Sequence, residues 1–332
     1  MKLLITGGAG FLGSLLARTL LGRGALAGRR IEQLVLTDLV PPAADLLAHP
    51  GVVARTGPLL VECARLAAER FDGVFHLASA VSGECEADFD LGLRSNLDST
   101  RALLDALRAA GNVPRLVFAS SAAVFGGDPP GLALPDVVRD ETLPLPQTSY
   151  GTQKFVCEQL LADFTRKGFL DGRAVRLLTV SVRPGKPNGA ASGFLSGILR
   201  EPLAGQATRC PVALDTRVAL ASPARTMAAL IAAYEASRES FGGRTALNLP
   251  ALSVRVGEML DALEAVAGAR VRALVQLEPD AAIERIVGTW PARFDAQRAA
   301  RLGLKADPDF LSIVRQYLHD HPAAVQVELR PG

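Results

Sequence analysis

The feature that most constrains the fold is a glycine-rich turn between an apolar run and an amphipathic segment near the N-terminus. Leu3, Leu4 and Ile5 form the run, the turn reads Thr-Gly-Gly-Ala-Gly-Phe-Leu-Gly over residues 6–13, and apolar residues then recur at helical spacing to Leu20. This order predicts a strand, a tight turn and a helix. Glycines at these spacings are typical of a dinucleotide-binding turn, although glycine turns also occur where nothing binds.

The glycines have separate expected tasks in such a turn. Gly7 supplies the sharp bend, Gly10 lets the backbone approach a pyrophosphate, and Gly13 allows the helix to pack closely on the strand. A second apolar run ends at Asp38, whose carboxylate is placed to accept hydrogen bonds from both hydroxyls of an adenosine ribose. Apolar residues follow and no arginine stands there to meet a 2′-phosphate, so the sequence favours NAD over NADP. A helix cap or a solvated loop acid is the alternative for Asp38.

Alternating apolar runs and amphipathic segments continue along the first half of the chain. They predict strands near residues 52–54, 73–80, 115–119 and 174–182, and helices near 61–70, over 91–110 and from Ser149. This alternation predicts an α/β fold, with a Rossmann-type doubly wound parallel sheet covered by helices on both faces. The proline-rich segment 126–148 predicts a long loop, and loops of this length are usually functional lids.

Beyond Arg183, prolines break the alternation, which indicates a smaller, discontinuous substrate lobe. Strands at 218–220 and 246–249 are expected to return to the sheet around a helix at 224–237, and 254–267 and 310–318 are expected to be helical. The predicted domains are an NAD-binding domain of residues 1–182 plus about 213–250, and a substrate lobe of about 183–212 plus 251–322. Residues 323–332 are expected to form a flexible tail.

Composition limits the class of partner. The 332 residues are 49% hydrophobic and 21% charged with a formal net charge of +2, which is ordinary for a packed soluble protein and argues against disorder. No basic run with interleaved aromatics occurs, so neither nucleic acid nor a membrane is expected as a partner. The four cysteines and four histidines lack metal-ligand spacing, so we expect reduced thiols, no metal and a cytoplasmic location.

Tyr150 and Lys154 stand four residues apart, which places them on one face of a helix. Solvated helices carry such pairs freely, and the preceding glycine turn, Asp38 and serine-ended strand are what favour a catalytic pair. Tyr150 is then expected to remove a hydroxyl proton while hydride leaves the same carbon. Lowering a tyrosine pKa from near 10 by about 3 units requires about 4 kcal/mol, which Lys154 and a cationic nicotinamide ring are expected to supply together.

Other polar residues accompany this pair. Ser121 ends the strand that starts at residue 115, and it is expected to donate and accept hydrogen bonds at the substrate oxygen, with a turn serine as the alternative. Asn96 is expected either to fix a backbone kink or a water leading to Lys154, or to be an ordinary polar-face residue. His76 is expected to be a hydrogen-bonded histidine at a strand end, without a catalytic role.

Together these residues resemble a family, the extended short-chain dehydrogenase/reductases, which include nucleotide-sugar epimerases and dehydratases. The resemblance covers nearly all of the chain and implies that Ser121, Tyr150 and Lys154 form a catalytic triad, with Lys154 also holding the nicotinamide ribose. It also implies a homodimer, paired through the helices that carry Asn96 and the Tyr-Lys motif. The implied NAD contacts include Phe11, Leu12, Leu77, Ala78 and Asn96 besides the glycines, Asp38, Tyr150 and Lys154. The motifs that carry the resemblance are the glycine turn, Asp38, His76-Leu-Ala78, Asn96, Ser120-Ser-Ala-Ala-Val-Phe-Gly126 and Tyr150-Gly-Thr-Gln-Lys154.

The chain departs from the nucleotide-sugar enzymes of this family after residue 182. Those enzymes typically continue with Arg, two residues and Asn-x-Tyr/Phe-Gly-Pro, whereas this chain reads Arg183-Pro-Gly-Lys-Pro-Asn188. Lys186 therefore stands in place of the asparagine. The glycine-rich hairpin before the arginine that grips a sugar diphosphate is missing, although Arg217 matches the place of that arginine. Gly57-Pro-Leu59 replaces an acid expected near the adenine, so contact there is expected through backbone or shape.

The run from Ser181 to Asn188 looks closer to the subgroup that contains D-erythronate dehydrogenases, which oxidise the C2 hydroxyl of a four-carbon sugar acid with NAD. The resemblance thus implies an NAD-dependent dehydrogenase of a small anionic sugar acid, with D-erythronate as the best single expectation. The alternatives are a nucleotide-sugar 4-epimerase or dehydratase and a dinucleotide-sensing regulator, the last disfavoured by the intact triad. The substrate carboxylate needs a cation, and each candidate is otherwise an ordinary surface charge. The candidates are Arg183, Lys186, Arg200 and Arg217, with Asn188 and Ser192 as further substrate-binding residues.

Overall fold

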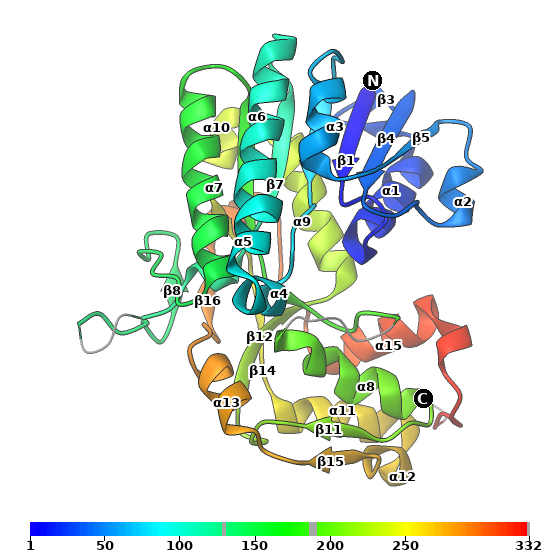
Figure 1. Cartoon of the computed structure of the whole chain (residues 1–332). Helices are drawn as coiled ribbons and strands as arrows, with labels where there is room; N and C mark the ends of the chain where they lie inside the picture. Colours follow the sequence, from blue (N-terminus) through cyan, green and yellow to red (C-terminus); the bar gives the residue numbers. More distant parts are fainter. Residues whose placement is uncertain (128–130, 186–190, 331–332) are drawn as a thin grey trace.

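The computed structural model describes residues 1–127, 131–185 and 191–330. Its centre is a seven-stranded sheet with the order β13-β9-β7-β6-β1-β4-β5 (Figure 1), and every neighbouring pair is parallel. The predicted Rossmann-type sheet is therefore confirmed. The strands are β1 Lys2–Thr6, β4 Gln33–Asp38, β5 Val52–Thr56, β6 Gly73–His76, β7 Arg115–Ser121, β9 Asp171–Leu177 and β13 Leu247–Asn248.

Helices cover both faces of the sheet (Figure 1). Residues of α1 and α9 share one hydrophobic core with the sheet, and residues of α3, α6 and α7 share another on the opposite face. The predicted helices are present, and the one expected over 91–110 is interrupted by a π-helical turn, η1 (Leu93–Asp98). The covering helices are α1 Phe11–Arg23, α3 Leu59–Leu66, α6 Ser99–Ala110, α7 Ser149–Arg166 and α9 Pro223–Glu235.

Alternate residues of each strand point to these two cores. On β1, Leu3 and Ile5 belong to the core with α1 and α9, whereas Leu4 belongs to the core with α3, α6 and α7. All three side chains are fully buried. Burial on both faces explains why the strand reads as a continuous apolar run in the sequence rather than as an alternation of apolar and polar residues.

A second group of elements lies beside the carboxyl ends of the sheet strands and has a hydrophobic core of its own. Figure 1 shows α8, α11 and α15 together in this region. Its strands form a three-stranded sheet of order β10-β12-β14 and a two-stranded pair of β11 with β15. The elements are α8 Phe194–Leu203, α11 Val256–Ala267, α12 Ala269–Arg272, α13 Ala281–Gly288, α15 Phe310–Asp320, β10 Thr179–Val180, β11 Thr208–Cys210, β12 Arg217–Ala221, β14 Leu252–Arg255 and β15 Val275–Leu277.

Two strand predictions need correction. The expected strand over 174–182 is divided, because the chain leaves the main sheet after β9 and pairs as β10 with β12 in the small sheet. Residues 218–220 also lie in that small sheet and not in the main one. On β12, Val218 and Leu220 face the core of the second region while Ala219 faces the main core. A strand buried on both faces carries no local signal of the sheet to which it belongs.

The loop expected over 126–148 is attached to the C-terminal part of the chain. Within it, β8 (Val138–Arg139) pairs with β16 (Phe294–Asp295), and the backbone N–H of Arg298 donates to Asp140 Oδ2 at 2.9 Å. The remaining short elements are β2 Ala25–Leu26, β3 Arg29–Arg30, α2 Ala44–Leu47, α4 Ser82–Ala87, α5 Phe89–Gly92, η2 Ala122–Val124, η3 Ala191–Gly193, α10 Arg238–Phe241, α14 Gln297–Arg301 and η4 Pro322–Ala324.

The C-terminal segment, which we expected to fray, makes backbone hydrogen bonds with the second region. The N–H of Gln326 donates to Leu203 O and the N–H of Arg330 donates to Val266 O, both at 2.8 Å. Among the helices of the described ranges, none combines the length and the apolar character that crossing a membrane requires.

A buried ion pair ties α7 to the sheet. Glu158 on α7 and Arg176 on β9 are 3% and 6% exposed, and Arg176 donates to both carboxylate oxygens of Glu158, at 3.0 and 2.8 Å. Ser120 Oγ at the end of β7 donates to Glu158 Oε1 at 2.5 Å, and Arg176 Nη1 donates to Asn248 Oδ1 on β13 at 3.2 Å. The pair therefore connects one helix to three adjacent strands.

We predict that Glu158→Ala lowers the free energy of unfolding by about 3–5 kcal/mol, because it leaves the Arg176 charge buried without a partner. The double variant Glu158→Leu, Arg176→Leu should show a smaller decrease in the free energy of unfolding than the single variant, because no buried charge remains. Urea unfolding followed by circular dichroism measures both. A loss below about 1 kcal/mol in Glu158→Ala would show that water reaches Arg176 and that the pair is not a structural tie.

Candidate functional site

The glycine turn connects the end of β1 to the start of α1 with no room for side chains. Gly7 has a φ of +70°, and a Cβ on it would lie 2.8 Å from the backbone nitrogen of Ala78. A Cβ on Gly13 would lie 2.0 Å from the carbonyl oxygen of Gly7. Only glycine allows the turn at Gly7 to lie this close to both the segment after β6 and the first turn of α1.

Asp38 ends β4 beside this turn. Its Oδ2 accepts from the N–H groups of Ala9 and Gly10, at 2.9 and 3.2 Å, and its Oδ1 accepts from the N–H of Leu39 at 2.7 Å. The carboxylate is thereby held in one orientation while remaining partly exposed. Each carboxylate oxygen has two lone pairs, so Oδ1 retains capacity to accept from a ligand hydroxyl.

A cavity of about 1180 Å³ runs along the carboxyl ends of the sheet strands, from Asp38 past the glycine turn to Tyr150 and Arg183. The chain passes from β1 outward to β4 and β5 and then returns to β6 on the other side of β1. The cavity therefore lies at the point where the strand order reverses, which is where open α/β sheets bind ligands. Its volume exceeds the usual range for one small ligand.

The lining of this cavity fits a dinucleotide. Gly7, Gly10 and Gly13 face it, Asp38 stands at one end, and its walls also include four of the residues implied as NAD contacts by resemblance. No acidic side chain was expected in the segment after β5, and Gly57, Pro58 and Leu59 line the cavity there. The four residues are Phe11, Leu12, Leu77 and Ala78.

Tyr150 and Lys154 lie in the first two turns of α7, on the face that meets the end of β7. Thr148 caps the helix by accepting from the N–H of Gly151 at 3.0 Å. Lys154 Nζ donates to the carbonyl oxygen of Ala119 at 2.9 Å and lies 5.5 Å from the centroid of the Tyr150 ring. Both side chains line the cavity together with Ser121. The tertiary structure thus brings the three residues of the expected triad to one place.

Burial governs the proton affinities of this group. It raises the pKa of Tyr150 to about 12, while hydrogen bonds with the hydroxyls of Ser121 and Ser79 and the charge of Arg183 act in the opposite direction. Burial lowers the pKa of Lys154 to about 8. Without bound cofactor, the lysine therefore does not bring the tyrosine pKa below its ordinary value, and the expected lowering is left to the positive charge of the nicotinamide ring.

Asn96 lies in the π-helical turn η1, which interrupts the helix expected over 91–110. Its Oδ1 accepts from the N–H of Ala80 at 2.7 Å and from Ser79 Oγ at 3.0 Å, and its Nδ2 donates to Gln153 Oε1 at 2.8 Å. Asn96 is absent from the described residues that line the cavity. It positions Ser79 against α7 and does not face the cavity itself.

His76 is held between two threonines at the end of β6. Thr100 Oγ1 donates to Asn96 O at 2.5 Å, so it must accept from His76 Nε2, 2.9 Å away. Nδ1 is then the acceptor for Thr6 Oγ1 at 2.6 Å. Burial lowers the pKa of His76 to about 3, and the ring is neutral. The expectation of a hydrogen-bonded strand-end histidine is confirmed.

The cationic residues expected to bind the substrate do not all lie at the cavity. Arg183 and Ser192 line the cavity, whereas Arg217 and Arg200 are not among its described lining residues. Arg200 is instead buried, donates to the carbonyl oxygen of Arg183 at 2.9 Å and pairs with Glu201 at 2.5 Å. Lys186 and Asn188 lie outside the described residues.

Sequence reasoning missed several lining residues. Ser79 follows β6 in a run of small residues, which was a signal of space for a ligand but not of a hydroxyl beside Tyr150. Arg94, on η1, also lines the cavity. Ile286 and Trp290 line it as well, although they lie far along the chain from the other residues. No local pattern marks these last two, because only the packing of the second region brings them there.

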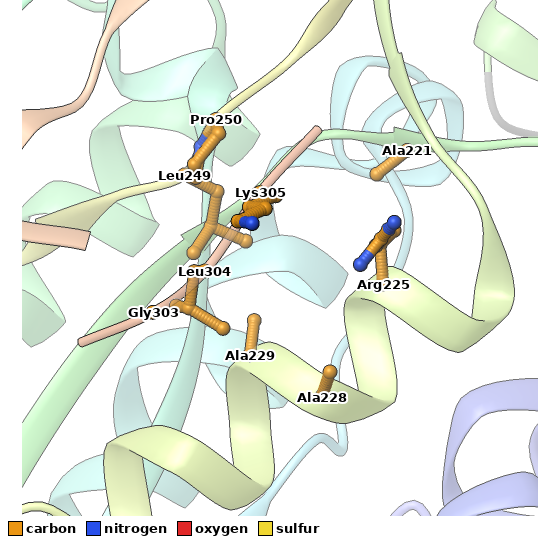
Figure 2. A pocket seen from close by; sticks show the side chains of 9 residues that line it. All are labelled: Ala221, Arg225, Ala228, Ala229, Leu249, Pro250, Gly303, Leu304 and Lys305. Atoms are coloured by element: carbon orange, nitrogen blue, oxygen red, sulfur yellow. The ribbon is translucent and has the colours of Figure 1, made fainter. Parts of the chain in front are cut away.

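A second, smaller cavity of about 60 Å³ is shown in Figure 2. Its charged lining residues are Arg225, on α9, and Lys305. Asp307 accepts from the N–H of Ser222 at 2.8 Å, and its other oxygen lies 3.8 Å from Arg225 Nε. A carboxylate of the chain therefore already meets the N-terminus of α9 and Arg225. This cavity is too small and too well neutralised to be the candidate site.

Known proteins resemble the chain over its whole length. It is 51% identical to D-erythronate dehydrogenase of Cupriavidus necator, covering 96% of this chain and 98% of that one. It is 41% identical to D-erythronate dehydrogenase of Haemophilus influenzae, covering 96% and 99%. The crystal structure of the nucleoside-diphosphate-sugar epimerase from Agrobacterium tumefaciens superposes with a TM-score of 0.90 at 44% identity, covering 98% of this chain and 95% of that one.

The expected family is confirmed by a match over the part of the chain that holds the glycine turn, Asp38, Ser121, Tyr150 and Lys154. The model of the NAD dependent epimerase/dehydratase family matches residues 3–218, a range that also includes the sheet from β1 to β9. This chain belongs to the NAD dependent epimerase/dehydratase family.

Proposed function

We propose that this protein is an NAD-dependent dehydrogenase of a small sugar acid, and that it converts D-erythronate to 2-oxo-D-erythronate. The observation that carries this proposal is that one cavity holds Tyr150, Ser121 and Lys154 together with Arg183. The first three suit the oxidation of an alcohol, and the guanidinium suits a carboxylate. The substrate of the Cupriavidus and Haemophilus relatives, at 51% and 41% identity, supports the choice of acid.

The cofactor is held by the first half of the cavity. We infer that the N–H groups at the start of α1 face the pyrophosphate, that Asp38 accepts from the adenosine ribose, and that Lys154 donates to the nicotinamide ribose. When bound, NAD supplies a positively charged ring beside the Tyr150 phenol and accepts a hydride from the substrate carbon.

The side chains of the protein hold the substrate and move its proton. Ser121 donates to the reacting oxygen, and Tyr150 Oη takes the proton of that hydroxyl. Arg183 holds the carboxylate, which decides which hydroxyl of the acid meets Tyr150. Asn96 acts indirectly, because it accepts from the Ser79 hydroxyl, which lowers the Tyr150 pKa.

We further propose the division expected from the sequence, with residues 1–182 plus about 213–250 binding NAD and about 183–212 plus 251–322 forming the substrate lobe. The strands β10 and β12 of the small sheet lie at the boundary, since residues of β12 contribute to both cores. A homodimer through the α6 and α7 side of the molecule is supported by the exposed apolar side chains of Phe89 and Val156, 60% and 38% exposed. A light-scattering mass of a single 34.9 kDa chain would exclude it. A cytoplasmic location is supported by the free thiols of all four cysteines.

The first prediction concerns cofactor choice. Asp38→Ala should weaken NAD binding by about tenfold and NADP binding less, because the carboxylate accepts from a ribose diol but repels a 2′-phosphate. Calorimetric titration of both cofactors measures this difference. Asp38→Asn keeps one acceptor oxygen, so its affinity for NAD should lie between the affinities of the wild-type protein and of Asp38→Ala. A wild-type protein that binds NADP as tightly as NAD would contradict the assignment.

The second prediction concerns the base. Tyr150→Phe should lower kcat by about 10²–10⁴-fold while NADH still binds, because only the ionisable oxygen is lost. Ser79→Ala removes a hydroxyl that lowers the Tyr150 pKa, so that pKa should rise. Activity requires the deprotonated phenol, and the acidic limb of kcat/KM should therefore move to higher pH.

Rates of NAD reduction measured across the pH range locate that limb. Ser95→Ala removes another hydroxyl that lines the cavity, and as the control it should leave the limb in place. Near-normal turnover by Tyr150→Phe would show that Tyr150 is not the base.

The third prediction tests the substrate class. Incubation with D-erythronate should reduce NAD stoichiometrically, which the absorbance of NADH records, whereas UDP- and GDP-sugars should give no net NADH. Arg183→Ala should raise the KM for the acid by about 10–100-fold and leave the KM for NAD nearly unchanged. Arg217→Ala is the matched comparison, because this arginine lies outside the described lining of the cavity.

A second candidate function is that of a nucleotide-sugar epimerase. It is supported by the Agrobacterium structure, which is 44% identical to this chain and is named a nucleoside-diphosphate-sugar epimerase. Tight binding of a UDP-sugar, followed by interconversion of sugars without net NADH, would replace the dehydrogenase with an epimerase.

A further inference from the structure

One wall of the cavity comes from a segment far from the catalytic sequence motifs. Ile286, Trp290 and Pro291 line the same cavity as Tyr150 and Arg183. Ile286 belongs to α13, and Trp290 is the only tryptophan of the chain. We name residues 278–295 the closing segment. Figure 1 shows it in orange, running from β15 past α13 to β16.

The closing segment is fixed at its start to the second region. The backbone N–H of Glu278 donates to Cys210 O at 3.0 Å, and that of Asp280 donates to Pro211 O at 2.9 Å. Asp280 also caps α13 by accepting from the N–H of Ala282 at 2.8 Å. Val287 is buried in the hydrophobic core of this region, and Trp290 packs against the same core. The start of the segment therefore does not move independently of the substrate lobe.

Its end is fixed to the loop that leads to α7. The N–H of Val138 donates to Arg293 O at 2.9 Å, and Arg293 Nη1 lies 3.0 Å from Asp136 Oδ2. The ring of Phe294 meets the ring of Phe125 edge-on, with centroids 6.2 Å apart. Phe125 follows the short helix η2 that begins directly after Ser121. The wall is thus connected on this side to the segment that positions Ser121.

Trp290 is held between these two attachments, and α13 also contacts η3, which carries Ser192. An indole ring is large and has only two rotatable bonds, so ordering it costs little conformational entropy. It therefore offers a large apolar wall at low entropic cost. Since Arg183 fixes the carboxylate in the proposed function, the far end of the acid must lie within the space that remains.

We propose that Trp290 closes the substrate end of the cavity and sets the length of the acid that the enzyme accepts. This inference rests on the proposed function and adds a residue that determines specificity. On this proposal, a four-carbon acid held at Arg183 is accepted, whereas a six-carbon acid or a nucleotide sugar meets the indole. Selection by chain length then comes from the closing segment and not from the triad.

The test compares kcat/KM for D-erythronate with kcat/KM for D-gluconate, a six-carbon acid. Trp290→Ala should raise the ratio of gluconate to erythronate by about tenfold, a typical effect of changing the size of an apolar pocket. Trp290→Phe keeps an aromatic wall and should change the ratio less. Arg285→Ala changes an exposed residue of α13, the helix that precedes Trp290, and Arg285 lies outside the described lining of the cavity. This variant should leave the ratio unchanged. An unchanged ratio in Trp290→Ala, with erythronate still oxidised, would overturn the inference.

Fluorescence of the wild-type protein gives a second readout that does not depend on turnover or on the folding of a variant. All tryptophan emission comes from Trp290, so adding D-erythronate to the NADH-loaded protein should change it. If aldonates alter the emission but none is oxidised, the proposed function fails while the position of Trp290 beside the acid stands. If erythronate is oxidised without any change in emission, or if UDP-glucose binds tightly, the inference itself fails.

Discussion

The contact between α7 and the carboxyl end of β7 is the constraint on which the candidate site depends. Residues one and two helical turns apart on a single face of α7 all meet the segment 119–123. Because these contacts lie on one face, they fix both the rotation of α7 about its axis and its position along β7. Tyr150 is thereby placed beside Ser121. The contacts are Gly151 against Ala123 O, where a Cβ would lie 2.1 Å away, Lys154 Nζ to Ala119 O at 2.9 Å, and Ser120 Oγ to Glu158 at 2.5 Å.

Burial gives this arrangement its chemical character. The Tyr150 phenol and the Lys154 ammonium group line the cavity, and the His76 imidazole is buried near Lys154. The loss of hydration favours the neutral form of each. The neutral His76 ring is held in one tautomer by hydrogen bonds with two threonines. Lys154 has a pKa of about 8 and keeps its charge at neutral pH, whereas Tyr150, with a pKa of about 12, holds its proton in the free protein. A further positive charge beside the phenol would favour its deprotonated form.

The two ends of the cavity are built in different ways. The cofactor end uses backbone geometry, since the glycine turn and the carboxylate of Asp38 offer fixed donors and acceptors with little side-chain freedom. The other end, where we propose that the substrate binds, is assembled from separate parts of the chain, with Arg183 from the segment after β10 and Trp290 from the segment after α13. Residues at this end can be substituted without disrupting the sheet, so substrate specificity can differ between members of one family.

The sequence by itself determined the parallel sheet, the glycine turn, Asp38 and the group of Ser121, Tyr150 and Lys154. These depend on local period, on turn residues and on spacing along one helix, all of which are written in neighbouring positions. Only the tertiary structure decided that the strand at 174–182 divides between two sheets, that Arg183 and not Arg217 lines the cavity, and that the hydroxyl of Ser79 lowers the Tyr150 pKa. It alone placed Trp290, because that position depends on the attachments at Cys210 and Val138, which are far from it along the chain.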